Sequence, residues 1–213
     1  QQRSSAASDV YKRQEMVPHL DKHEEEGIVG REAWKAMGDA GLLGMTVPEE
    51  MGGLGLDFSF NAIFSEELAY MGSSAGFTLQ NDITADYFVQ YGTQDQIEKY
   101  VPGIISGDII TAIAMTEPGA GSDLQGVSTT AIKDGNEYVL NGSKTYITNG
   151  QNADVIIVVA KTDPSLGAKG ISLILVDADT EGFERGRNLD KVGQHCADLS
   201  LIHISEPTRR TPI

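Results

Sequence analysis

The spacing of apolar residues changes near residue 108, and this change limits the folds that the chain can adopt. Before that point, apolar side chains recur every three or four positions, as on one face of an α-helix. After it they alternate with polar residues and are rich in β-branched types, as in strands. The pattern predicts the α+β class: an all-helical domain followed by an antiparallel β-barrel or sandwich.

The local signals place the elements within each part. Helical segments are expected at Ala33–Leu43, Phe60–Met71 and Thr78–Tyr91 and from Thr93 onward. Thr93 with Gln96 three residues later is a capping-box pattern, and Pro102 is expected to bend or end that helix. Strands are expected at residues 109–115, 127–133, 138–140, 146–148, 155–160 and 171–176. Asp134-Gly135 predicts a hairpin turn, and Asn141-Gly142 a further turn or a bulge.

Charge and composition exclude several functions. A formal net charge of −15 repels phosphate backbones, so nucleic acid is not an expected partner. The single cysteine, Cys196, rules out a disulfide framework and fits a reducing compartment. No apolar run reaches the roughly 18 residues that a membrane span needs, so membrane insertion is not expected.

The two ends differ from the rest of the chain. Residues 1–14 are polar and without pattern, and residues 199–213 turn basic beside an acidic body. Both ends resemble translated sequencing-adapter read-through, which predicts a non-native leader and a non-native tail. The native sequence would then comprise a helical domain at residues 15–107 and a β domain at residues 108–198.

The segment from Ile113 to Gly126 carries the strongest chemical signal. A strand is followed there by small residues and hydroxyls, and Gly119 and Gly121 let backbone amides approach a ligand closely. From the residues alone, a ligand loop and an ordinary hairpin loop are about equally favoured. The glycine spacing does not fit a dinucleotide fingerprint, and no βαβ unit surrounds it.

This segment resembles the first signature of the acyl-CoA dehydrogenases at every position. Further matches follow in the family's order: Val47–Gly55, Tyr91–Pro102, Asn141–Gly150 and Val192–His195. The likeness covers nearly all of residues 15–198 and is closest to the long-chain branch. It implies a flavoprotein that dehydrogenates fatty acyl-CoA to trans-2-enoyl-CoA and passes electrons to an electron-transferring flavoprotein. It also implies a homotetramer in the bacterial cytoplasm or mitochondrial matrix.

The resemblance further implies that FAD lies between the β domain and a C-terminal helical bundle, which this chain lacks. Met115 and Thr116 would contact the polar edge of the flavin ring, Tyr146 would stack where many relatives carry Trp, and Thr148 would lie near the hydride-accepting nitrogen. Ser122 would reach the pyrophosphate or the substrate's thioester arm. The implied cofactor-binding residues are Ile113, Met115, Thr116, Gly121, Ser122, Tyr146, Ile147 and Thr148.

No catalytic residue is assigned within this chain. The family's base is a glutamate of the C-terminal bundle, and Glu117 is expected to belong to the loop. The fragment is therefore expected to be inactive. Two alternatives remain: an acyl-CoA oxidase-like flavoenzyme of the same fold, and a non-catalytic domain that binds acyl-CoA or a partner.

Other reactive residues have simpler interpretations. His19 and His23 share one helix face but are followed by acidic residues, and a solvated helix is favoured over a metal site. No metal ligands are assigned. Cys196 beside His195 is interpreted as a lone buried cysteine rather than a nucleophile.

Overall fold

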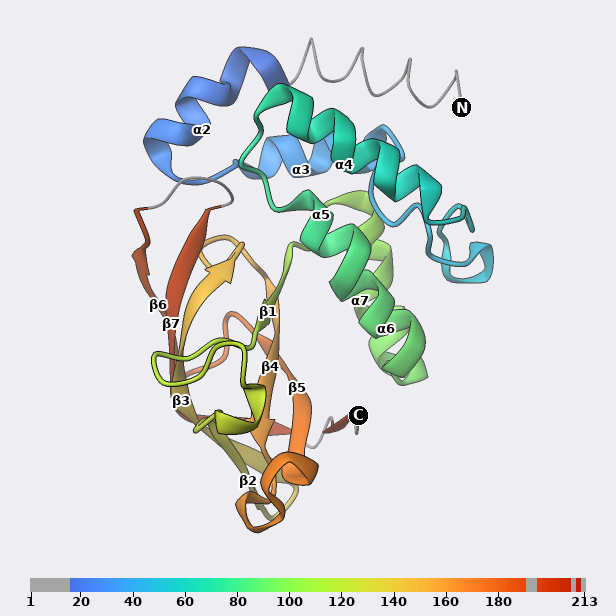
Figure 1. Ribbon diagram of the computed structural model, residues 1–213. Coiled ribbons are helices and arrows are strands. Elements are labelled where there is room, and N and C mark those ends of the chain that lie inside the picture. Colours follow the sequence, from blue (N-terminus) through green and yellow to red (C-terminus); the bar gives the residue numbers. More distant parts are fainter. Residues whose placement is uncertain (1–15, 191–194, 208–209, 212–213) are drawn as a thin grey trace. The chain divides into compact units, whose positions relative to one another are not determined.

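The computed structural model describes residues 16–190, 195–207 and 210–211, and these form two compact units (Figure 1). The first comprises the described residues up to Ile110 together with His195, and the second comprises the remainder. The predicted α+β class is confirmed, because helices make up the first unit and strands dominate the second. The predicted leader and the Val192–Gln194 part of the predicted motif lie outside the described residues.

The first unit is built from helices and short helical turns. Its elements are η2 (Val17–His19), α2 (Leu20–Glu26), α3 (Arg31–Asp39), η3 (Glu49–Met51), α4 (Ser59–Met71), α5 (Phe77–Leu79), η4 (Gln80–Thr84), α6 (Ala85–Tyr91) and α7 (Gln94–Ser106). The apolar stripe of α3 turns inward at Trp34, whose ring meets the edge of Phe77 with centroids 4.5 Å apart. Both rings are fully buried, so this pair forms the centre of the unit's core.

The last helix confirms one prediction and corrects another. Thr93 Oγ1 accepts the amide of Gln96, and Gln96 Oε1 accepts the amide of Thr93, so the capping box is present. The expectation that Pro102 could end the helix is wrong, because α7 continues through it to Ser106. Pro102 and Glu98 are both exposed. Proline therefore lies on the exposed side of the helix, where losing one backbone hydrogen bond costs less than in the core, while buried Ile104 anchors the final turn.

The second unit is one curled sheet. Its strands are β1 (Thr111–Ala114), β2 (Thr130–Asp134), β3 (Glu137–Thr148), β4 (Val155–Lys161), β5 (Ile171–Asp177), β6 (Phe183–Asn188), β7 (Cys196–Pro207) and β8 (Arg210–Thr211). Two short helical turns, η5 (Leu124–Gly126) and η6 (Pro164–Gly170), lie in its loops. The strand order is β6-β7-β3-β2-β4-β5-β8, with β1 paired to β4 off this path.

The pairing within the sheet refines the expected antiparallel arrangement. Most neighbours are antiparallel, including the predicted hairpin at Gly135, but β1 runs parallel to β4 over its whole length. Asn141-Gly142 is not a turn, because β3 continues through it. The register shifts between Leu140 and Asn141, but the extra residue of this bulge lies in β7, opposite the predicted position. This register places β1 and β3 in the same unit, which matters for the candidate site.

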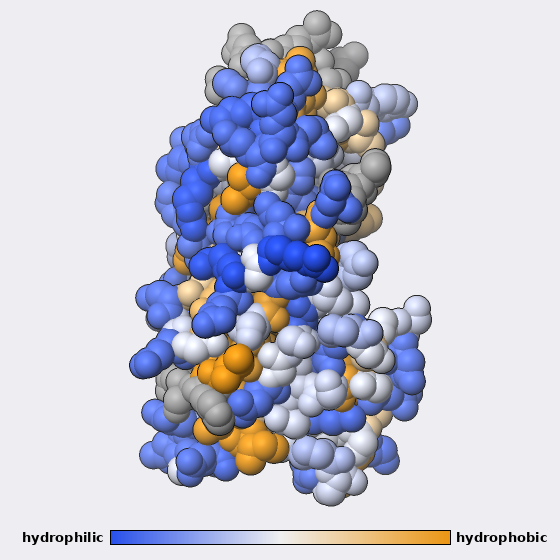
Figure 2. All heavy atoms as spheres, turned by 90° about the vertical axis from the view of Figure 1, so that its left-hand side faces the viewer, coloured by the Kyte–Doolittle hydropathy of each residue, from blue (hydrophilic) through white to orange (hydrophobic). Residues whose placement is uncertain are grey.

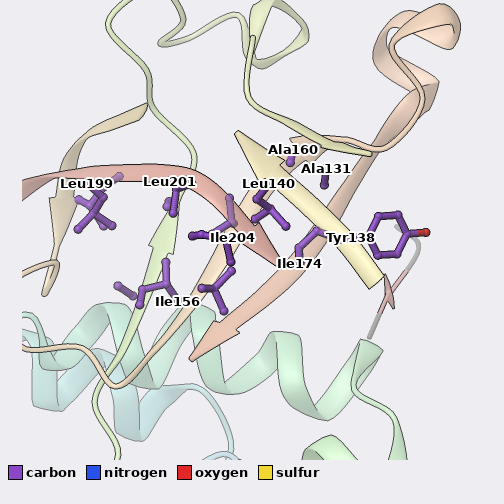
Figure 3. Packing of buried hydrophobic residues seen from close by; sticks show 14 of the residues in the cluster. Ala131, Tyr138, Leu140, Ile156, Ala160, Ile174, Leu199, Leu201 and Ile204 are labelled. Atoms are coloured by element: carbon purple, nitrogen blue, oxygen red, sulfur yellow. The ribbon is translucent and has the colours of Figure 1, made fainter. Parts of the chain in front are cut away.

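The core of the sheet lies inside its curl. It is formed by side chains from β2, β3, β4, β5 and β7, labelled in Figure 3: Ala131, Tyr138, Leu140, Ile156, Ala160, Ile174, Leu199, Leu201 and Ile204. The predicted start of a foreign tail, Leu199, therefore falls inside a buried strand. The limits of the native sequence, Glu15 and Asp198, stay predictions.

The face of the protein shown in Figure 2 is mostly polar. Hydrophilic residues cover most of the face in Figure 2, and apolar residues gather there in small separate patches. Within the described residues, no helix combines the length and the apolarity that a membrane crossing requires.

Candidate functional site

The loop after β1 begins with a hydrogen-bonded turn and continues into a stretch in which Gly121 and Ser122 form no backbone hydrogen bonds with other described residues. Glu117 and Ala120 exchange two backbone hydrogen bonds of 2.9 and 3.1 Å, which close a tight turn around Pro118 and Gly119. A side chain at Gly119 or Gly121 would meet nothing within 4 Å, so the protein leaves space beside this backbone. Within the described chain, the amides of Gly121 and Ser122 donate to no acceptor. These amides are available to a ligand.

The second predicted segment lies at a distortion of β3. The register between β3 and β7 shifts again between Lys144 and Ile147, and Tyr146 within this bulge has a φ of 58°. A left-handed backbone is unusual for a large aromatic residue and costs on the order of 1 kcal/mol or more. The bulge points the Tyr146 side chain outward, where it is 61% exposed. The strand thus presents an aromatic ring that is largely exposed to solvent.

Hydrogen bonds join the two predicted segments. The amide of Thr145 donates to the carbonyl of Thr116 over 2.9 Å, and Lys144 Nζ donates to the carbonyl of Met115 over 3.1 Å. The end of β1 therefore lies against β3 within one rigidly paired sheet, although the ladder partner of β1 is β4. Met115 and Thr116 are thus held beside Lys144 and Thr145, the two residues that precede Tyr146. Their roles at a flavin stay predictions.

The remaining predicted residues differ in how they reach this place. Ile113 and Ile147 are buried, so only their backbone could meet a ligand. Thr148 is half-buried, and its Oγ1 lies 3.4 Å from the buried thiol of Cys196. The interpretation of Cys196 as a buried cysteine is confirmed. Gly121 and Ser122 are exposed in the loop, and no hydrogen bond within the described chain links them to Tyr146.

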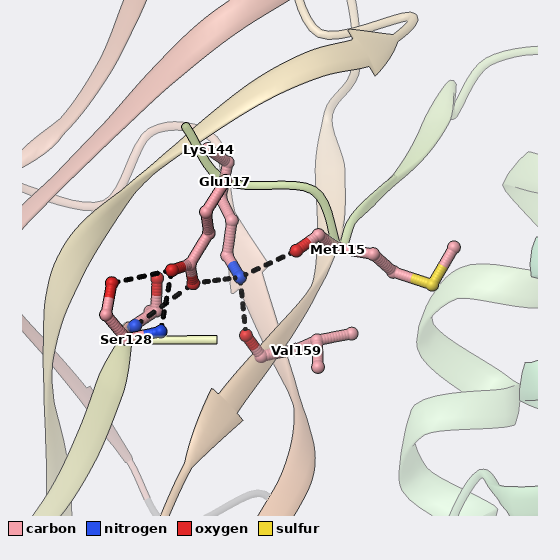
Figure 4. Close-up of polar contacts among 6 residues, drawn as sticks. Met115, Glu117, Ser128, Lys144 and Val159 are labelled. Atoms are coloured by element: carbon pink, nitrogen blue, oxygen red, sulfur yellow. Dashed lines mark hydrogen bonds and ion pairs between the residues drawn. The ribbon is translucent and has the colours of Figure 1, made fainter. Parts of the chain in front are cut away.

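Sequence reasoning missed a buried ion pair beneath this loop (Figure 4). Lys144 Nζ lies 2.8 Å from Glu117 Oε1, and the two side chains are 0% and 2% exposed. Glu117 Oε2 accepts the amide and the hydroxyl of Ser128, both at 2.6 Å, and Oε1 accepts the amide of Thr129 at 3.0 Å. Lys144 Nζ also donates to the carbonyl of Val159 over 2.8 Å.

Both groups of the pair have shifted pKa values: burial lowers the pKa of Lys144, and its hydrogen bond with Glu117 partly offsets this shift. Burial alone would raise the pKa of Glu117, but hydrogen bonds from Lys144, Ser128 and Thr129 outweigh it and lower the pKa to about 2. The carboxylate is therefore ionised and fully hydrogen-bonded at neutral pH. Glu117 belongs to the loop, as expected, and cannot act as a base toward an outside substrate.

His19 and His23 form no metal centre within the described part of the chain. His23 is buried on α2 near His19, with ring centroids 6.3 Å apart. Among the described residues, no group of three or more His, Cys, Asp or Glu side chains is arranged to hold a metal ion.

Comparisons with known proteins follow the same division into two units. The model of the acyl-CoA dehydrogenase N-terminal domain matches residues 4–108, and that of the acyl-CoA dehydrogenase middle domain matches residues 112–206. The mitochondrial long-chain specific acyl-CoA dehydrogenase of Mus musculus is 47% identical over 196 residues, which are 91% of this chain and 46% of that protein. The chain thus spans about half the length of this curated relative.

Solved structures share the fold. The crystal structure of an acyl-CoA dehydrogenase from Geobacillus kaustophilus matches with a TM-score of 0.94 and 43% identity, over 100% of this chain and 59% of that one. A glutaryl-CoA dehydrogenase from Mycobacterium smegmatis, solved in complex with FADH2, matches with a TM-score of 0.88 and 28% identity, over 99% of this chain and 55% of that one.

Proposed function

This chain belongs to the acyl-CoA dehydrogenase family, and from that premise we propose that the full-length protein converts fatty acyl-CoA thioesters to trans-2-enoyl-CoA. The activity is proposed for the longer protein because this chain spans about half of its curated relative. The 47% identity to a long-chain specific enzyme favours a long acyl chain as substrate.

One observation carries this proposal: the polar backbone that follows β1 is bonded to the segment of β3 that also carries the exposed ring of Tyr146. A planar, partly polar ring system such as the isoalloxazine of FAD requires this combination of stacking surface and hydrogen-bonding groups. The bonds from Thr145 to Thr116 and from Lys144 to Met115 hold the two surfaces together. The residues present therefore fit FAD. The related glutaryl-CoA dehydrogenase, which was solved in complex with FADH2, supports this assignment.

Each residue has a proposed role at the flavin. Met115 and Thr116 offer backbone and hydroxyl groups to the polar edge of the ring, and Tyr146 supplies the stacking face. Thr148, whose hydroxyl lies near the thiol of Cys196, would lie toward the reactive nitrogen of a bound flavin. The backbone of Ile113 and Ile147 frames these contacts.

The loop residues are proposed to hold charged or polarised oxygen atoms. The unpaired amides of Gly121 and Ser122 can donate to a pyrophosphate or to the thioester arm of the substrate. Amides aimed at a thioester oxygen stabilise the negative charge that develops when the α-proton leaves. When bound, the flavin accepts the electron pair removed from the substrate.

The catalytic base is proposed to lie outside this chain. Glu117 is sealed against Lys144, with its pKa lowered to about 2, and so cannot remove an α-proton. The base would be a glutamate of the C-terminal bundle that the family resemblance implies. The chain by itself is therefore proposed to be inactive, and electrons in the full-length homotetramer are proposed to pass to an electron-transferring flavoprotein.

The test uses the purified full-length protein and its flavin absorbance. Bound FAD should give a visible spectrum that bleaches without oxygen when an acyl-CoA of the preferred length is added. Acyl-CoAs of graded length identify that length, and rapid reoxidation in air would favour the oxidase-like alternative. A protein that remains colourless after incubation with FAD would refute the proposal.

A matched pair of variants locates the site. Tyr146→Ala should weaken FAD binding because it removes the stacking face. Leu166→Ala, at a comparably exposed position on η6 of the same unit, should leave FAD binding unchanged. Equal FAD affinity in all three proteins would place the flavin elsewhere.

A further inference from the structure

The Glu117–Lys144 pair lies at the neck of the loop that the proposed flavin site uses. Glu117 and Met115 belong to the beginning of the loop, and Ser128 and Thr129 to its end (Figure 4). Glu117 binds the end through three hydrogen bonds, while Lys144 binds the beginning from β3. Residues 118–127, which include Gly121 and Ser122, therefore form a loop whose two ends are fixed at one place.

The ammonium group of Lys144 is fully satisfied by acceptors from two segments, the beginning of the loop and β4. Its three N–H donors meet the carbonyl of Met115, the carboxylate of Glu117 and the carbonyl of Val159 on β4, at 3.1, 2.8 and 2.8 Å. No other standard side chain supplies three diverging donors from a single atom. Lys144 thus fixes the distances between β3, β4 and the loop at once.

Stability alone does not account for this arrangement. A buried ion pair loses its hydration on folding, and apolar replacements of similar volume are often equally stable. What an apolar replacement cannot reproduce is the directed bond to the carbonyl of Met115. Lys144 also stands two residues before the left-handed backbone of Tyr146, which persists only where its surroundings fix it.

We propose that Lys144 is a positioning residue of the flavin site, and that its buried pair with Glu117 sets the spacing between the Met115–Thr116 edge and the Tyr146 ring. This inference rests on the proposed function, because it assumes that these two surfaces face a flavin. Lys144 touches no part of the ligand and acts through the residues that do. The pair keeps the wall of the site in one geometry before the ligand arrives.

The test compares two variants of the full-length protein with the wild type. Lys144→Met removes the directed bonds but leaves the Glu117 charge buried and unpaired, which can prevent folding. The double variant Glu117→Gln/Lys144→Met leaves no buried charge, and the oxygen of the new amide can still accept the hydrogen bonds from the amide and hydroxyl of Ser128. The double variant should fold yet bind FAD at least about tenfold more weakly, with a reduced visible circular dichroism band of bound flavin.

A stability-matched control separates positioning from simple destabilisation. Ile174→Ala on β5 removes part of a buried side chain of the same sheet without touching the ion pair. At a temperature well below both unfolding midpoints, this control should keep the FAD affinity and the flavin dichroism of the wild type. If the control weakens FAD binding as much as the double variant does, or if the double variant binds like the wild type, the inference is overturned.

Hydrogen exchange gives an answer that does not depend on the flavin. Backbone amides of residues 115–117 and 145–148 should exchange faster in the double variant than in the wild type, while those of β5 keep their rates. A wild-type protein that takes up no FAD would refute the proposed function alone. Unchanged exchange in both segments would refute the role of Lys144.

Discussion

The dependence of the free energy of unfolding on acidic pH is the most direct test of the buried Glu117–Lys144 pair. The folded β unit lowers the pKa of Glu117 from 4.5 to about 2. Because the folded pKa is depressed, the stabilisation from this carboxylate is fully present above pH 4.5. It is lost as the pH falls toward 2, where the group takes up a proton in both states. A difference of one between the folded and unfolded pKa corresponds to about 1.4 kcal/mol, so the contribution of Glu117 is on the order of 3 kcal/mol.

The perturbation is Glu117→Gln, which keeps the shape of the side chain but cannot titrate. At neutral pH the variant should be less stable than the wild type by on the order of 3 kcal/mol. The gap should shrink to about 1 kcal/mol near pH ~2.5, because the wild-type carboxylate then loses most of its advantage.

The assay is urea unfolding at a series of pH values, with strand content followed by far-UV circular dichroism. Trp34 is the only tryptophan and lies in the core of the helical unit, so its fluorescence reports that unit separately. The tryptophan signal should show little difference between the two proteins at any pH. A gap between wild type and variant that stays constant from pH 7 down to about 2.5 would refute the pKa reasoning.

Two further predictions concern the helical unit and use the same unfolding measurement, followed by Trp34 fluorescence. Gly107→Ala should lower the free energy of unfolding by about 2 kcal/mol or more, because φ is 77° there and a Cβ would collide with the carbonyl of Trp34. Gly72→Ala should lower it by only about 1 kcal/mol, because φ is 70° but the space beside it is open. Equal losses of stability in the two variants would contradict the collision. Thr93→Ala should cost about 1 kcal/mol because it removes the capping bond to the amide of Gln96, and Thr93→Ser should restore most of it; a loss of the same size in the serine variant would show that the hydroxyl is not the cause.

Local patterns were sufficient for much of the fold. The capping box at Thr93 and the hairpin at Gly135 depend on residues a few positions apart, so the sequence displays them directly. The parallel pairing of β1 with β4 joins residues more than forty positions apart, and no local pattern encodes it. Pro102 misled the prediction because the cost of proline in a helix depends on whether water reaches the freed carbonyl.

The segments that form the candidate site were predictable from the sequence, but the buried ion pair beneath them was not. The signature around Thr116 and the segment at Tyr146 were identified as neighbours through the family resemblance, and the sheet brings them together. Lys144 continues the inward alternation of Tyr138 and Leu140 along β3, but this pattern does not identify its partner, because Glu117 comes from a loop 27 residues away in the sequence. Glu117 stood within the recognised motif, and that was the only available signal.

The left-handed backbone at Tyr146 bears on how this protein should be engineered. A library screened only for heat resistance would favour glycine or asparagine at this position, since both tolerate that conformation better than tyrosine does. The clones it enriched would have lost the aromatic surface proposed to hold the cofactor. Thermostabilisation of this protein therefore needs selection for retained yellow colour alongside selection for survival.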